Sequence, residues 1–140
     1  MKTIPGLECI LLIEDDKATN FIHTLAIEEL GIDVKIQVCL NGQEGLDYLA
    51  CKGKYADNTK YPKPGIIFLD INMPLMDGWE FLAEYNNLPE EQKAKIVLMM
   101  VSSSTNPDDE NRALSLNKVN GYITKPLTAG LIAEIIEKHF

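Results

Sequence analysis

The stretch Ile66–Gly78, which reads IIFLDINMPLMDG, decides the fold of this 140-residue chain. It opens with four consecutive apolar residues that run directly into one carboxylate, Asp70. An apolar run without polar alternation is typical of a β-strand that is covered on both faces. Pro74 cannot continue a strand, and Asp77 with Glu80 three residues later matches the capping box of a helix start. The stretch therefore predicts a buried strand with an acid at its end, then a loop and a helix.

Apolar strands alternate with amphipathic helices along the rest of the chain. The pattern predicts five strands, at Cys9–Ile13, Val34–Val38, Ile66–Asp70, Ile96–Val101 and Gly121–Thr124. Strict alternation of strands and helices implies a parallel sheet with helices on both faces and right-handed crossovers. In such sheets the functional site lies beyond the carboxyl ends of the strands, where the strand order reverses.

Three further segments carry specific expectations. We expect the helix after the first strand to stop at Gly31 and to bury one apolar stripe, formed by Ala18, Phe21, Ile22, Leu25, Ala26 and Leu30. Cys51–Gly65 is polar and contains prolines and glycines, which predicts an extended loop. Asn106 followed by Pro107 predicts a capped helix over Asn106–Asn117.

The composition excludes several classes of function. The chain has 21 acidic and 13 basic residues, a formal net charge of −8, which argues against a nucleic-acid-binding face. Its three cysteines are odd in number and widely spaced, as expected for reduced thiols in a cytosolic protein. No stretch approaches the length of a membrane span, and the first apolar run is too short for a signal peptide. We expect a single cytoplasmic domain over residues 1–140, without nucleic-acid or membrane partners.

Four of the predicted strands deliver chemically active groups to one edge of the sheet: Glu14 and Asp15, Asp70, Ser102, and Lys125. Three close carboxylates repel one another unless a cation lies among them, and Mg²⁺ prefers oxygen ligands. Lys125 can hold a phosphoryl oxygen as a point charge, and the Ser102 hydroxyl can donate a hydrogen bond to another. A carboxylate nucleophile with Mg²⁺, a lysine and a hydroxyl is sufficient for phosphoryl transfer onto aspartate.

The chain resembles the receiver domain of a two-component response regulator, in particular the single-domain chemotaxis regulators. The resemblance rests on LLIEDD, on LDINMP followed by DG, on the serine after VLMMV, and on GYITKP. Each motif is weak alone, but the spaced set is specific and covers nearly the whole chain. It implies a doubly wound, flavodoxin-like (βα)5 fold of class α/β, with a five-stranded parallel sheet in the order 2-1-3-4-5.

The resemblance also implies a role for each residue of the site. Asp70 is expected to be the phosphoacceptor. The expected Mg²⁺ ligands are Glu14, Asp15, Asp70 and the backbone carbonyl of Asn72. The expected phosphoryl-binding and switch residues are Ser102, Lys125 and Tyr122. The residues expected to tune dephosphorylation are Asn72 and Ser104, and the bond before Pro126 is expected to be cis.

The expected donor is a phosphohistidine on a sensor histidine kinase or a histidine phosphotransfer protein. Output is expected through a downstream protein target or through a phosphorelay. Because the helix after Lys125 ends the chain at Phe140, we expect a stand-alone receiver without a DNA-binding domain, as a monomer or weak dimer. Such a protein catalyses its own phosphorylation and dephosphorylation and is not an enzyme with a separate substrate.

The residues leave several alternatives open. Asp16 makes the acidic run three residues long, so the metal-binding pair could lie one residue later, although the apolar strand ends at Ile13. Tyr122 can be an ordinary half-buried aromatic residue, and His23 is expected to be an incidental helix residue. A Mg²⁺-dependent aspartyl-phosphate hydrolase shares the nucleophile, but Asn72 stands where such enzymes usually carry a second acid. A degenerate receiver that serves only as a binding module would not take up phosphate.

Overall fold

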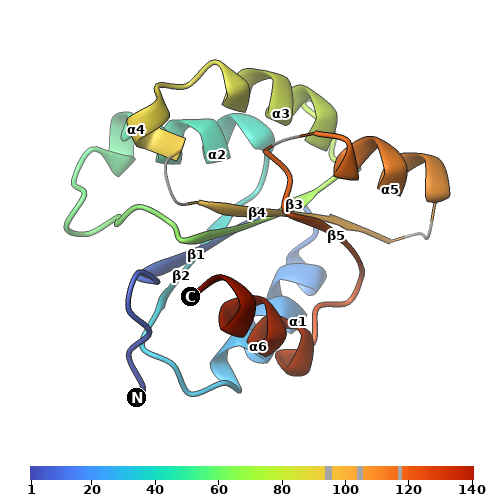
Figure 1. Ribbon diagram of the computed structural model, residues 1–140. Helices are drawn as coiled ribbons and strands as arrows, with labels where there is room; N and C mark the ends of the chain where they lie inside the picture. The colour runs from blue at the N-terminus through green and yellow to red at the C-terminus, as the bar shows by residue number, and fades with distance from the viewer. Residues whose placement is uncertain (94–95, 104–105, 117) are drawn as a thin grey trace.

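The computed structural model describes residues 1–140 except 94–95, 104–105 and 117 (Figure 1). Its centre is a parallel sheet of five strands in the order β2-β1-β3-β4-β5, which confirms the predicted fold. The strands are β1 (Cys9–Ile13), β2 (Lys35–Cys39), β3 (Ile66–Asp70), β4 (Val97–Ser102) and β5 (Gly121–Thr124). The helices are α1 (Lys17–Glu28), α2 (Gly42–Leu49), α3 (Gly78–Asn86), α4 (Glu90–Lys93), α5 (Pro107–Leu114) and α6 (Ala129–His139), with a short 3-10 helix, η1 (Gly53–Tyr55).

Two helical layers cover the sheet. In Figure 1, α1 and α6 lie below it, whereas α2, α3, α4 and α5 lie above it. Because successive side chains of a strand point to opposite faces, each central strand contributes to an upper and a lower core. On β3, Ile67 and Leu69 belong to the upper core, and Ile66 and Phe68 to the lower core. Every residue of β1, β3 and β4 is buried, as their uninterrupted apolar runs predict, whereas the edge strand β2 is mostly half-buried.

Helix α1 is rotated away from the predicted orientation. Phe21 is 66% exposed, and Ile22 and Leu25 are each 50% exposed. The buried face consists instead of Asn20, His23, Ala26 and Ile27. The predicted stripe was therefore wrong for Phe21, Ile22 and Leu25 and for the exposed Ala18. It was correct for the buried Ala26, and Leu30 is half-buried against the lower core. The Asn20 amide donates a hydrogen bond of 2.9 Å to the backbone carbonyl of Glu14, and this bond holds α1 in the observed rotation.

Four elements differ from the prediction. The short helix α4 was not predicted, and its Lys93 donates a hydrogen bond of 3.0 Å to the carbonyl of Asn86 near the end of α3. Strands β2 and β4 each lie one residue later than predicted. Helix α5 ends at Leu114, and the predicted end at Asn117 lies outside the described residues. The loop over residues 51–65 is present as predicted and contains η1.

The three cysteines are free thiols. Cys9 and Cys39 are buried, whereas Cys51 is exposed. Within the part of the chain that the structure describes, no helix is long and apolar enough to cross a bilayer.

Candidate functional site

The carboxyl ends of four strands meet at one edge of the sheet, here called the rim, which comprises Glu14, Asp15, Asp70, Ser102 and Lys125. The parallel register brings them level, because Ile13 lies opposite Leu69 and Ser102 opposite Thr124. The carboxylates of Glu14, Asp15 and Asp70 each offer an oxygen, and these oxygens lie within 4.8 Å of one another. The sheet thus gathers three acids from two strand ends.

Asp16 has a different function from its two acidic neighbours. It is the N-cap of α1, and its carboxylate accepts hydrogen bonds from the backbone N–H of Thr19, at 3.1 Å, and from the Thr19 hydroxyl. These hydrogen bonds lower the pKa of Asp16. Of the three consecutive acids, Glu14 and Asp15 therefore belong to the carboxylate cluster that could hold a metal ion, whereas Asp16 caps a helix.

Lys125 connects two of the clustered acids. Its Nζ forms an ion pair with Glu14 and lies 3.3 Å from Oδ1 of Asp70. Both acids are buried, and the Lys125 side chain is 17% exposed. Burial alone would lower the pKa of Lys125, but the hydrogen bond with Glu14 and the charge of Asp70 outweigh it and raise the pKa. Lys125 is consequently held as an ammonium ion.

Asp15 is the exposed member of the cluster. Loss of solvent around its carboxyl group raises the pKa of Asp15, and the hydrogen bond with Glu14 raises it further. Among the described residues, Lys125 is the ammonium group paired with these three carboxylates, which leaves an excess of negative charge. A divalent cation with a preference for oxygen ligands would neutralise this excess, so the donor set fits Mg²⁺.

The backbone around Asp70 is tightly packed. The backbone N–H of Gly78, at the start of α3, donates a hydrogen bond of 2.8 Å to the carbonyl of Ile71. A Cβ atom added at Gly78 would lie 2.9 Å from both the carbonyl oxygen of Asp70 and the Cα of Ile71. The side chain of Asp70 is further oriented by the N–H of Asn72, which lies 3.3 Å from Oδ1. Asp70 therefore projects from a rigid strand end.

The remaining predicted residues lie on or beside the rim. Ser102 is fully buried at the end of β4, and its carbonyl accepts a hydrogen bond of 2.7 Å from the N–H of Lys125. Tyr122 is half-buried against the upper core, and Asn72 is exposed. The Lys125–Pro126 peptide bond is cis. Ser104, expected to tune dephosphorylation, lies outside the described residues.

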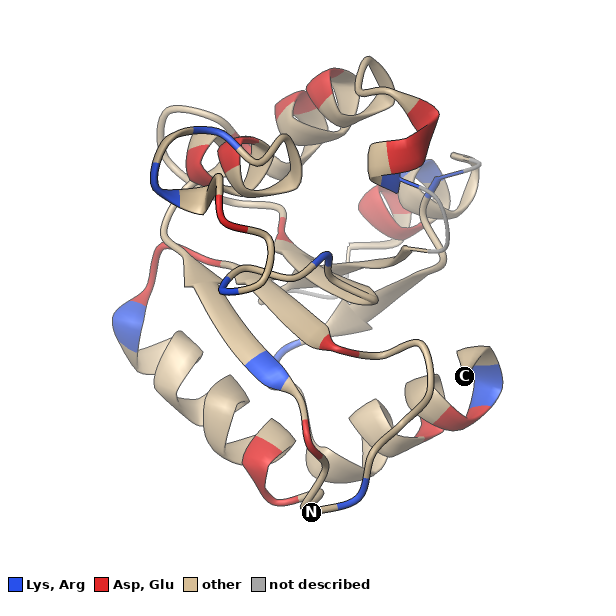
Figure 2. Cartoon of the chain, turned by 90° about the vertical axis from the view of Figure 1, so that its left-hand side faces the viewer, with Lys and Arg blue, Asp and Glu red and all other residues tan. Residues whose placement is uncertain are grey.

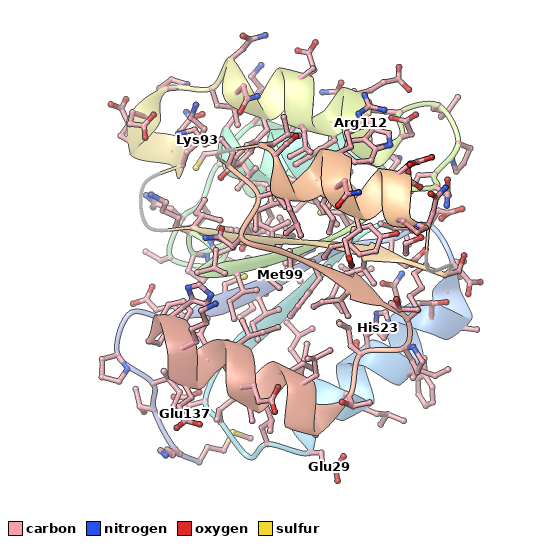
Figure 3. All side chains as sticks on the ribbon, turned by 45° about the vertical axis from the view of Figure 1, so that its right-hand side comes forward. His23, Glu29, Lys93, Met99, Arg112 and Glu137 are labelled. Carbon is pink, nitrogen blue, oxygen red and sulfur yellow. The ribbon has the colours of Figure 1, made fainter. Side chains whose placement is uncertain are left out.

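His23 was not expected to take part in the site. It lies on α1, below the sheet in Figure 3, and is only 3% exposed. Among the described residues its Nε2 has no hydrogen-bond partner. Burial, together with the smaller effect of the charge of Lys125, lowers the pKa of His23 to about 4. In the sequence, His23 lies three residues after Asn20 and three before Ala26, and residues three apart share one face of a helix. This spacing places the three residues on the buried face of α1.

A model of the response regulator receiver domain matches residues 10–137 of the chain. The response regulator Rcp1 of Synechocystis is 33% identical over 116 residues, which cover 83% of this chain and 75% of Rcp1. The crystal structure of Rcp1 with bound Mn²⁺ has a TM-score of 0.71 at 29% identity, covering 94% of this chain and 90% of that one.

Two other solved structures are similar over nearly the whole length. A two-component response regulator from Cytophaga hutchinsonii has a TM-score of 0.82 at 32% identity, covering 94% of this chain and 96% of that one. The phosphorylated cyanobacterial phytochrome response regulator RcpA has a TM-score of 0.74 at 31% identity, covering 94% of this chain and 90% of that one.

Proposed function

The chain belongs to the response regulator receiver domain family, and from this premise we propose that it accepts a phosphoryl group on Asp70 in a Mg²⁺-dependent reaction. The observation that carries the proposal is the position of Asp70, which lies within the acid cluster and also beside the Lys125 ammonium group. Crystal structures of a phosphorylated relative and of a Mn²⁺-bound relative support it.

A carboxylate oxygen of Asp70 attacks the phosphorus atom of a phosphohistidine. A P–O bond forms as the P–N bond breaks, and the imidazole of the donor leaves with the electron pair of that bond. Lys125 and the Ser102 hydroxyl would bind oxygens of the transferred group, which reduces the charge that develops on it. Because Lys125 already pairs with Asp70, only a small displacement of its ammonium group is needed.

Mg²⁺ would be held by Glu14, Asp15, Asp70 and the backbone carbonyl of Asn72. When bound, it supplies positive charge that offsets the repulsion between the acids and the incoming phosphate. Before the cation binds, Lys125 partly compensates Glu14 and Asp70. In the absence of both cations the three carboxylates would resist ionisation together.

A protein donor also needs a docking surface, and α1 offers one. Its exposed residues Phe21, Ile22 and Leu25 form an apolar surface on the helix that starts directly after the acid pair. Exposed apolar surface of this kind marks protein contacts. We propose that this face binds the histidine kinase or phosphotransfer protein, and that the transfer takes place in the cytoplasm. Phe21→Ser should slow transfer from that protein while leaving uptake from acetyl phosphate unchanged.

Output would start at Ser102 and Tyr122. A phosphoryl group carries a charge near −2 and strong acceptor oxygens, so it would attract the Ser102 hydroxyl. Movement of Ser102 at the end of β4 would open space that Tyr122 on the neighbouring strand can fill. The surface formed by α5, β5 and α6 would then change and bind a downstream protein, with a partial shift in population.

Intact mass after incubation with acetyl phosphate and Mg²⁺ tests the proposal. We expect a gain of one phosphoryl group in the wild type, none in Asp70→Asn, and none in wild type with EDTA. Asp33→Asn, which changes an exposed acid away from the rim, is the matched control and should gain the group. Phosphorylation of Asp70→Asn would refute the assignment of the acceptor. Steady turnover of a generic phosphate ester would indicate a hydrolase instead.

A further inference from the structure

The loop over residues 51–65, here called the lysine loop, is anchored by aromatic side chains. The rings of Tyr48, Tyr55 and Tyr61 contact one another, with centroid separations of 4.9, 5.0 and 6.0 Å. The Tyr48 hydroxyl donates a hydrogen bond of 2.7 Å to the carbonyl of Pro62, and the Tyr55 hydroxyl donates one of 2.8 Å to Glu44. A loop with these anchors has a defined shape.

The charge of the lysine loop is opposite to that of the chain. It carries four exposed lysines and a single acid, in a protein with a net charge of −8. The exposed lysines are Lys52, Lys54, Lys60 and Lys63. Figure 2 looks onto this side of the molecule and shows blue segments gathered on the loop and on the adjoining strand β2, whereas the helices carry mostly red segments.

Three lysine ammonium groups lie against the tyrosine rings. Lys54 is 5.1 Å from the centroid of the Tyr55 ring, and Lys35 of β2 and Lys60 are 5.3 and 5.5 Å from that of Tyr61. Cation–π contacts of this length restrict the lysine side chains without removing their charge. Lys54 also forms an ion pair with Glu44, at 3.8 Å, which compensates part of its charge. The charges are therefore partly preorganised, which reduces the entropy lost when a partner binds them.

A cavity of about 290 Å³ lies beside the lysine loop. Its apolar lining comes from Tyr48, Leu49, Tyr61, Pro62 and Pro64. Glu8 and Glu91 line it as well, so a bound acidic group would lie on the loop side and not over these two residues. The volume is at the lower limit of small-molecule pockets, roughly 300–1,000 Å³, and suits one large side chain better than a whole cofactor.

We propose that the lysine loop and this cavity form a docking surface for an acidic segment of another protein, which inserts one large apolar side chain into the cavity. Charge complementarity would bring the segment to the loop, and the cavity would fix its position. A nucleic acid fits less well, because its extended polyanion would also meet the acidic remainder of the chain. The loop joins the end of α2 to the start of β3, so it lies at the sheet edge opposite the rim, and docking is compatible with phosphorylation.

Fluorescence anisotropy with synthetic peptides tests the charge requirement. The probe is a labelled peptide of glutamates around one phenylalanine, and the variant is Lys54→Gln with Lys60→Gln. The matched control is Lys17→Gln with Lys138→Gln, which removes the same charge from α1 and α6. We expect the loop variant to weaken binding about five-fold or more and the control to change it less than two-fold. Equal losses in both variants, or no binding by the wild type at low salt, would overturn the proposal.

The exposed thiol of Cys51 gives a separate test of the cavity, because Cys51 lines it while Cys9 and Cys39 are buried. Alkylation with N-ethylmaleimide should abolish the preference for the phenylalanine peptide over a peptide of glutamates alone, with an unchanged circular dichroism spectrum. Asn58→Trp, another change at the cavity lining, should do the same. A preference that survives both changes would refute the cavity as the anchor. Tighter binding of single-stranded oligothymidine than of the peptide would refute a protein partner.

Discussion

Gly78→Ala should destabilise the fold and distort the rim, although alanine is the better helix former. Gly78 is the first residue of α3, and a Cβ at this position would lie 2.9 Å from the carbonyl oxygen of Asp70 and 2.9 Å from the Cα of Ile71. These neighbours are backbone atoms of the strand end and cannot rotate away as a flexible side chain can. Either α3 or the end of β3 must move.

The size of the effect follows from two opposing terms. Overpacking against fixed neighbours typically costs about 1–3 kcal/mol. Replacing glycine by alanine in a helix returns about 0.5–1 kcal/mol. The net loss should lie between roughly 0 and 2.5 kcal/mol. Its centre, about 1 kcal/mol, lowers the melting temperature of a domain of this size by roughly 3–4 °C. Gly130 in α6 is the matched control, because no atom lies within 4 Å of an added Cβ, so Gly130→Ala should leave stability unchanged or increase it.

Urea denaturation followed by circular dichroism measures both variants. Circular dichroism is preferable to tryptophan fluorescence, because Trp79 is adjacent to the substituted residue. Phosphoryl uptake from acetyl phosphate should also slow in Gly78→Ala and remain normal in Gly130→Ala, since only the first substitution crowds the backbone of Asp70. If both variants unfold at the same urea concentration, the close approach of α3 to the strand end has no energetic consequence and the reasoning fails.

Three further predictions concern single side chains. Without metal, Asp15→Asn should be more stable than wild type at pH 7, because the raised pKa of Asp15 means that the fold disfavours its ionised form. This gain in the free energy of unfolding should disappear when the pH falls below the usual carboxyl pKa, and Mg²⁺ titration should show weaker binding by the variant. The pKa of His23 falls from 6.5 to about 4 on folding. The free energy of unfolding of the wild type, measured in urea, should therefore fall by about 2 kcal/mol between pH 7 and pH 5, and His23→Leu should largely abolish this fall. Tyr48→Phe removes the hydrogen bond to Pro62, so it should cost about 1 kcal/mol and increase amide hydrogen exchange in the lysine loop, as mass spectrometry would detect.

The strands and the groups at their ends could be predicted from the sequence. A strand that is covered on both faces must be apolar throughout, so β1, β3 and β4 appear as uninterrupted apolar runs. Strict alternation with helices makes the strands parallel, and parallel strands end at a common edge. Glu14, Asp70, Ser102 and Lys125 can therefore be assigned to one edge without knowledge of any side-chain contact. Helix caps such as Asp77 are equally local, because they depend on residues three positions apart.

Only the tertiary structure decided how the elements are turned toward one another. Helix α1 carries apolar residues around much of its circumference, so its buried face is set by contacts with the sheet and by the Asn20–Glu14 hydrogen bond. The ion pair of Glu14 with Lys125 joins the first strand end to the last, and no local pattern signals such a pair. Tyr55 and Tyr61, the anchoring tyrosines that belong to the lysine loop itself, also lie outside any periodic pattern. Which side chains of an irregular loop turn inward depends on the surface that the loop covers, and that surface exists only after folding.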